Sequence, residues 1–178
     1  SKSLRFFDQL NVPVRVLGRG SNLLICDGGI AGAVIRPSGG EFSEVSVSGD
    51  LITAGVGARF KKLSNIAKKN EITGFEWMEG IPGNVGGGLR MNAGAMGVET
   101  FDQVVSVKFL DSEGRLHEKS SEELKAKYRN VPELKNNYAV SAVFKGGKGN
   151  VKEIEKLTQD SMVKRKASQP IAASAGCI

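Results

Sequence analysis

The first residues whose types and spacing could do chemistry form a glycine-rich loop, Gly18-Arg19-Gly20-Ser21-Asn22-Leu23. Two glycines at this spacing let successive backbone N–H groups point into one concavity, and such a concavity binds phosphate oxygens. Ser21 and Asn22 add side-chain donors, and Arg19 adds positive charge. The loop is neither a P-loop nor a GxGxxG motif. A tight turn with a hydrogen-bonded Ser-Asn pair explains the same residues, so this loop alone leaves both interpretations open.

A second glycine-rich segment runs from Glu79 to Gly97 and contains seven glycines in nineteen positions. Ordering so many glycines costs a great deal of chain entropy, so the segment needs a compensating contact. A flat ligand lying against bare backbone would provide that contact. The alternative is a glycine-rich crossover packed against a sheet.

The elements that must position these loops follow from the spacing of apolar residues. Helical spacing and strand alternation are interleaved without a clear βαβ repeat, which predicts an α+β fold. No clear period is visible over 74–97. A capping box, Ser120 with Glu123, predicts a short helix ending near Tyr128. The other expected elements are helices around 4–10, 60–70 and 151–166, a strand at 14–17, hairpins over 45–56 and 105–119, and a strand at 138–145.

Composition narrows the function classes. The 178 residues carry a net charge of +6, which suggests an anionic partner such as a phosphorylated small molecule. A nucleic acid is not expected, because no aromatic-rich basic strand is present. Two cysteines and one histidine cannot supply a usual structural zinc site, so no metal is expected. No apolar run resembles a signal sequence or a membrane span, which predicts a cytoplasmic protein without membrane contact.

Five motifs occur in order: GRGSNLL at 18–24, GIPG at 80–83, RMNAGA at 90–95, YR at 128–129 and SAGC at 174–177. This combination resembles the MurB family, the UDP-N-acetylenolpyruvoylglucosamine reductases, along nearly the whole chain. The resemblance implies an α+β FAD-binding fold of the vanillyl-alcohol-oxidase or p-cresol-methylhydroxylase type with two α+β subdomains. It also implies that NADPH reduces FAD, which then delivers hydride to the enolpyruvyl ether of a UDP-sugar, yielding UDP-N-acetylmuramate for peptidoglycan.

The resemblance also assigns cofactor contacts by motif. The first loop is expected to hold the FAD pyrophosphate, and the second segment to line the remainder of the flavin. Two departures from the family pattern, Asn84 in place of threonine and Met96 in place of an aromatic residue, remove no proposed catalytic function. The expected contacts are Gly18, Arg19, Gly20, Ser21, Asn22 and Leu23, followed by Gly80, Ile81, Pro82, Gly83, Gly86, Asn92, Gly94 and Ala95.

Hydride addition to an enol ether leaves negative charge on the adjacent carbon and its carboxylate, so the site needs a cation and a proton donor. By resemblance, Arg129 polarises the substrate carboxylate or enol, and Cys177 is the general acid. Local sequence alone favours a helix-end arginine and a small buried cysteine instead. Tyr128 and Lys166, together with the neighbouring Arg165, are expected to contact the UDP-sugar.

The chain is expected to divide into part of a first FAD-binding subdomain at 1–37, a second at 38–168, and the start of a truncated substrate domain at 169–178. No inserted substrate-clamping loop is visible, as in the shorter of the two types of the family, and a monomer is expected. Two other functions stay open. One is a non-catalytic FAD- or nucleotide-binding module, and the other is a different FAD-linked oxidoreductase of the same fold.

Overall fold

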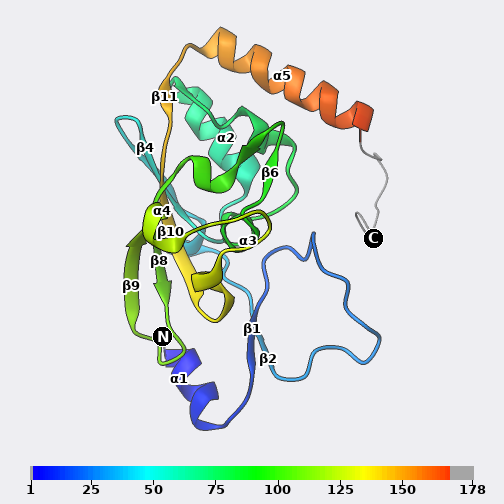
Figure 1. Ribbon diagram of the computed structural model, residues 1–178, viewed down its shortest axis with the longest axis vertical. Helices are drawn as coiled ribbons and strands as arrows, with labels where there is room; N and C mark the ends of the chain where they lie inside the picture. The colour runs from blue at the N-terminus through cyan, green and yellow to red at the C-terminus, as the bar shows by residue number, and fades with distance from the viewer. Residues whose placement is uncertain (1, 169–178) are drawn as a thin grey trace.

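A computed structural model describes residues 2–168, and its centre is a five-stranded antiparallel sheet (Figure 1). The strands lie in the order β3-β4-β10-β8-β9, so the two predicted hairpins flank the long strand β10. Alternating apolar residues turn one face of this sheet inward, and Ile52, Val107 and Phe144 are completely buried. The strands are β3 (Val45–Ser48), β4 (Leu51–Gly55), β8 (Val104–Leu110), β9 (Leu116–Ser120) and β10 (Tyr138–Lys145).

Two predicted helices contact the 3-10 helix that leads into the second glycine-rich segment. Helix α2 (Phe60–Lys69) buries Phe60 and Leu63 from its apolar stripe. Helix α5 (Val151–Ser168), orange in Figure 1, packs against the 3-10 helix η2 (Glu76–Gly80). Short strand pairs complete this region: β5 (Ile72–Thr73) with β11 (Gly147–Lys148), and β6 (Gly94–Ala95) with β7 (Val98–Glu99).

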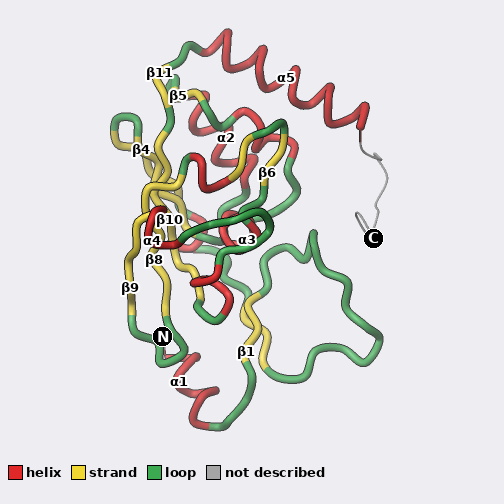
Figure 2. Tube along the Cα trace, in the orientation of Figure 1, coloured by secondary structure: helices red, strands yellow, loops and turns green. Residues whose placement is uncertain are grey.

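The N-terminal part consists of helix α1 (Lys2–Gln9) and two parallel strands, β1 (Val14–Val16) and β2 (Ala33–Ile35). The chain between these strands is one long loop, which Figure 2 shows as an unbroken green stretch projecting from the body. The first glycine-rich motif begins this loop. It therefore leaves the end of a strand, as the sequence predicts, and lies where a ligand can reach its backbone.

The second glycine-rich segment contains a helix that the sequence analysis did not predict, α3 (Val85–Met91). Three consecutive glycines disfavour an isolated helix, so the reason lies in packing. A Cβ added at Gly86 would lie 3.0 Å from Cβ of Val56, and one added at Gly88 would overlap the ring of Phe60. The two glycines thus let α3 approach the β4–α2 connection closely, and this contact compensates for their low helix propensity.

This packing gives a stability prediction with a built-in control. Gly88→Ala is expected to destabilise the fold by about 1–3 kcal/mol, because the new methyl group must displace the buried ring of Phe60. Gly87→Ala is its matched control, since Gly87 lies in the same helix with nothing within 4 Å of an added Cβ. It should instead stabilise by about 0.5–1 kcal/mol through helix propensity. Denaturant unfolding of both variants measures the two changes in the free energy of unfolding. Equal changes in the two variants would contradict the packing argument.

The capping box at Ser120 is confirmed, but the helix that it begins is shorter than predicted. Helix α4 (Ser121–Leu124) ends four residues before Tyr128, because Lys125 adopts a left-handed conformation with φ 47°. The backbone N–H of Ser120, and then its hydroxyl, lower the pKa of Glu123. The motif Tyr128-Arg129 therefore lies on a separate turn, and Arg129 is not the helix-end arginine that local sequence favoured.

Three further 3-10 helices connect these elements. They are η1 (Gly40–Ser43), η3 (Thr100–Asp102) and η4 (Pro132–Lys135). Helix η3 matters for the site, since it follows β7 directly and its Thr100 hydroxyl donates to the Ala93 carbonyl at 2.6 Å. The end of the second glycine-rich segment is thereby fastened to η3.

Candidate functional site

The two glycine-rich motifs, more than sixty residues apart in sequence, meet in the structure. The Ser21 hydroxyl donates a hydrogen bond to the Pro82 carbonyl at 2.6 Å. Gly83 lies beside the same hydroxyl, and a Cβ at Gly18 would lie 4.0 Å from Cβ of Asn84. The first motif and the Gly80–Gly83 motif therefore form one continuous surface of backbone and small side chains.

The second segment is held firmly against the body at this junction. The Gly83 carbonyl accepts from the Phe60 N–H, and the Val85 N–H donates to the Ala58 carbonyl at 2.9 Å. Glu79 accepts from Lys61 at 2.9 Å and from the Asn65 amide at 3.3 Å. The segment is thus a rigid wall, while the first loop is the more open partner.

The junction itself tests whether these residues fit a bound cofactor. Asn84 Oδ1 has no hydrogen-bond partner among the described residues, but it is inaccessible even without a cofactor, so it is not the group that meets one. The backbone of Gly20, Ser21 and Asn22 is exposed instead. Successive exposed N–H groups bind phosphate oxygens, so the residues present at this junction fit the pyrophosphate of FAD.

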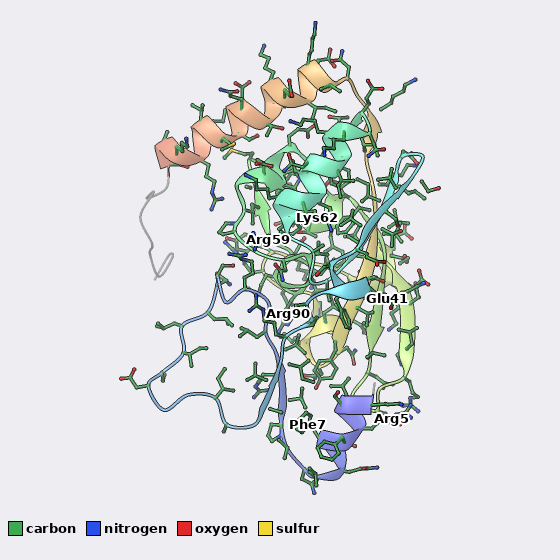
Figure 3. The ribbon with its side chains drawn as sticks, turned by 180° about the vertical axis from the view of Figure 1, so that it is seen from behind. Arg5, Phe7, Glu41, Arg59, Lys62 and Arg90 are labelled. Carbon is green, nitrogen blue, oxygen red and sulfur yellow. The ribbon has the colours of Figure 1, made fainter. Side chains whose placement is uncertain are left out.

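The first loop itself is exposed from Arg19 to Leu23. Gly20 has φ 73°, and nothing lies within 4 Å of a Cβ added there. The apolar side chains that follow, Leu23, Leu24 and Ile25, are also exposed. Figure 3 shows Arg59 and Arg90 on the side of the body from which this loop emerges, so two further cations lie in the region expected to receive a pyrophosphate.

A cavity of about 470 Å³, here called the Arg129 cavity, joins the predicted flavin and substrate motifs. The flavin side is contributed by Asn92, Gly94 and Ala95, and the substrate side by Tyr128 and Arg129. The remaining wall comes from Gly97, Val98 and the two acidic residues Glu99 and Asp102. The structure thus brings together five residues that the sequence analysis singled out from two distant motifs.

Tyr128 and Arg129 occupy the two central positions of a tight turn. The Lys127 N–H donates to the Asn130 carbonyl at 2.8 Å, and the Asn130 N–H returns to the Lys127 carbonyl at 3.0 Å. Arg129 has φ 55°, a conformation that glycine or asparagine usually supplies at this turn position. Its guanidinium lies 5.6 Å from the Tyr128 ring centroid and forms no ion pair with an acidic side chain of residues 2–168. Arg129 is therefore exposed and able to receive an anion.

The basic end of α5 approaches the site by Arg165 rather than by Lys166. Arg165 lies across Gly80, where an added Cβ would be 2.7 Å from its Cδ. Lys166 lines a different cavity, of about 550 Å³, with Lys68 and Glu155. The structure does not bring Lys166 to the Arg129 cavity, and its contact with a UDP-sugar stays a prediction.

The remaining candidates are placed as follows. Cys177 lies outside the described residues, so its role stays a prediction, while Cys26 is exposed on the long loop. His117 lies half-exposed on β9 with Nε2 2.8 Å from Asp111 Oδ2, and this contact lowers the pKa of Asp111. Within residues 2–168 no group of three or more His, Cys, Asp or Glu side chains could hold a metal ion. None of the helices described is long and apolar enough to cross a membrane.

Comparison with known proteins decides the family. The model of a family described as FAD binding domain matches residues 1–120, about two thirds of the chain. The chain belongs to the FAD-binding domain family. Membership confirms the predicted FAD cofactor and the α+β FAD-binding fold.

The relatives of this FAD-binding chain carry a more specific name. It is 41% identical over 175 residues to a UDP-N-acetylenolpyruvoylglucosamine reductase of Clostridioides difficile, covering 97% of this chain and 57% of the relative. A protein of that name from Paramagnetospirillum magneticum is 41% identical over 165 residues, covering 93% and 53%. The resemblance to the MurB family is therefore confirmed, and the chain spans about half the length of the curated relatives it matches.

Solved structures agree. The fold matches UDP-N-acetylenolpyruvylglucosamine reductase (MurB) from Thermus caldophilus with a TM-score of 0.83 at 32% identity, covering 97% of this chain and 62% of that chain. It also matches Phl p 4.0202, a glucose dehydrogenase, with a TM-score of 0.61 at 18% identity, covering 82% and 32%. The second match shows the shared FAD-binding fold alone.

Sequence reasoning missed two residues of this FAD-binding chain. Glu99 and Asp102 were not singled out, although both line the Arg129 cavity. The one available signal was their spacing, since two acids three residues apart can begin a helical turn, as they do at η3.

Proposed function

We propose that this chain is the FAD-carrying part of a UDP-N-acetylenolpyruvoylglucosamine reductase that uses NADPH and produces UDP-N-acetylmuramate for peptidoglycan in the cytoplasm. The observation that carries the proposal is the Arg129 cavity, where a guanidinium without an acidic partner among residues 2–168 shares the lining with Asn92, Gly94 and Ala95, which are expected to line the flavin. The names of the relatives support the same activity.

FAD held at this junction would supply the hydride carrier between NADPH and the double bond of the enolpyruvyl ether. The residues of the chain then have separate tasks. The junction of the two glycine-rich motifs binds and orients the cofactor through backbone groups and Ser21. Arg129 binds the substrate carboxylate, where a planar guanidinium donates two parallel hydrogen bonds and stabilises the charge that develops on hydride arrival. Cys177 donates a proton to the adjacent carbon, which completes the saturated ether.

The proposal is tested on the purified full-length protein in two steps. A flavin absorbance band is expected without added cofactor, and NADPH should bleach it. Addition of the enolpyruvyl UDP-sugar should then restore the band with one equivalent of product per flavin. A protein that binds FAD but is not reoxidised by this substrate would instead be the non-catalytic module or an oxidoreductase with another substrate.

The proton donor gives a separate prediction. In the full-length enzyme, Cys177→Ala should lower the rate of substrate reduction by about 10²-fold, the usual scale for removing a general acid. Cys177→Ser should keep substantial activity, because a hydroxyl can also donate. Flavin reduction by NADPH should be nearly unchanged in both variants, since no proton reaches the sugar in that step. Cys26→Ala is the control for loss of a thiol, because Cys26 is exposed on the long loop. If Cys177→Ala reduced the substrate at the same rate as the unmodified enzyme, Cys177 would be a packing residue rather than the proton donor.

A further inference from the structure

The side chain of Asn92 connects three segments that meet at the Arg129 cavity. Its Nδ2 donates to Glu99 Oε2 at 2.7 Å and lies 3.4 Å from the Lys127 carbonyl. Its Oδ1 accepts from the Phe101 N–H at 3.0 Å. Asn92 is itself buried, and its backbone is left-handed with φ 40°. Its side-chain amide therefore makes hydrogen bonds that the backbone of a continuing helix or strand would otherwise make. One side chain thus joins the end of α3, the β7–η3 corner and the Tyr128-Arg129 turn.

Glu99 determines which way this amide faces. An asparagine amide has two donors on nitrogen and an acceptor on oxygen, and the Phe101 N–H requires the oxygen on its own side. The carboxylate of Glu99 accepts on the opposite side, in a charge-assisted bond that is stronger than a neutral one. Glu99 also belongs to the capping box of η3, in which its backbone N–H donates to Asp102 Oδ2 at 2.7 Å and its side chain accepts from the Asp102 backbone. Within residues 2–168 no Lys or Arg forms an ion pair with Glu99, so its carboxylate serves the Asn92 amide and this cap.

The third contact transmits this order to Arg129. The Lys127 carbonyl is the first acceptor of the Tyr128-Arg129 turn, and it receives both the Asn130 N–H and Nδ2 of Asn92. Because Arg129 sits in a left-handed conformation that an arginine adopts at a cost of about 1–2 kcal/mol, the turn depends on such outside contacts.

We propose that Glu99 is a positioning residue for Arg129, acting through the Asn92 amide to fix the 127–130 turn at the mouth of the cavity. The role of Arg129 in this inference rests on the proposed function. The positioning of the 127–130 turn by Glu99 is independent of that function. Glu99 lines the same cavity as Arg129, so a disturbance at Glu99 stays local to the site.

The test compares Glu99→Ala, which removes the acceptor, with Glu99→Gln, whose amide oxygen still accepts from Asn92. The first measurement is amide hydrogen exchange on the flavin-free full-length protein. In Glu99→Ala the Lys127 and Asn130 amides should exchange at least about tenfold faster, while the amides of β10 stay unchanged. In Glu99→Gln they should stay within about threefold of the original. Glu118→Ala, on the edge strand β9 and outside the cavity, is the matched control and should change neither.

The second measurement separates the half-reactions of the full-length enzyme. Glu99→Ala should slow flavin reoxidation by the enolpyruvyl substrate about tenfold and raise the KM for that substrate. The rate of flavin reduction by NADPH should change by less than about twofold. Glu99→Gln should recover most of the loss. The inference is overturned if amide exchange at Lys127 and Asn130 is unchanged in Glu99→Ala. It is also overturned if exchange rises equally throughout the chain, and a variant that does not fold counts as such a general rise. If the unmodified enzyme ignores the substrate, the proposed function falls, and the exchange measurement still decides the role of Glu99.

Discussion

Replacing Gly20 with valine is expected to lower the affinity for FAD by at least about 100-fold, which corresponds to about 2.7 kcal/mol. Gly20 has φ 73°, and a β-branched residue strongly disfavours this conformation. To relieve the strain, the loop must rotate its peptide groups and so lose the converging N–H donors expected to face the pyrophosphate. Nothing packs within 4 Å of an added Cβ, so the chain should still fold. Flavin absorbance after purification and titration with added FAD measure the effect.

The same loop offers a closely matched control, Gly29→Val. Gly29 has φ 75°, and nothing lies within 4 Å of a Cβ added there, but it lies outside the expected FAD contacts. Both variants therefore introduce the same backbone strain into the same exposed loop. FAD affinity should fall in Gly20→Val alone, with similar unfolding midpoints in the two proteins. Equal flavin content in both would place the pyrophosphate elsewhere.

Arg129→Lys is expected to slow flavin reoxidation by the enolpyruvyl substrate about 10²–10³-fold in the full-length enzyme, the scale of removing one stabiliser of developing negative charge. A lysine keeps the charge but cannot reproduce the planar fork that binds a carboxylate by two parallel bonds. Reduction of the flavin by NADPH should change by less than about twofold, because no carboxylate charge develops in that step. Rapid-mixing measurements of each half-reaction give the two rates.

Arg115→Lys is the control for this substitution. Arg115 is exposed beside the turn between β8 and β9, where it pairs with Asp111 and Glu113 and does not line the Arg129 cavity. Neither half-reaction should change in this variant. Equal losses in both half-reactions of Arg129→Lys would mean that Arg129 supports the structure of the site rather than the charge of the substrate.

The elements with strong local signals could be predicted from the sequence. The 45–56 hairpin was visible because apolar alternation flanks Gly49-Asp50, and the structure pairs Ser48 with Leu51 across that turn. Helix α2 and strand β10 were equally clear, since each carries an uninterrupted apolar pattern. The two glycine-rich motifs were predicted to act together, and the Ser21–Pro82 hydrogen bond joins them in the described structure.

Features that depend on distant contacts could not be predicted. Helix α3 forms because Gly86 and Gly88 fit against Val56 and Phe60. The sequence of the glycine run contains no signal that indicates these partners. Helix α4 stops at Lys125 although its capping box suggested a longer helix. The role of Glu99 depends on Asn92 and on a carbonyl at Lys127, and no local pattern links the three.

The left-handed conformation of Arg129 sets protein stability against chemistry at one position. Glycine would occupy φ 55° without strain, so selection for thermal stability alone would replace the arginine. Such a replacement would look beneficial in any screen that scores only folding or expression, although it would remove the guanidinium that lines the Arg129 cavity. Efforts to stabilise this chain should therefore hold residue 129 fixed and seek their gains at positions such as Gly87, where added side chains meet open space.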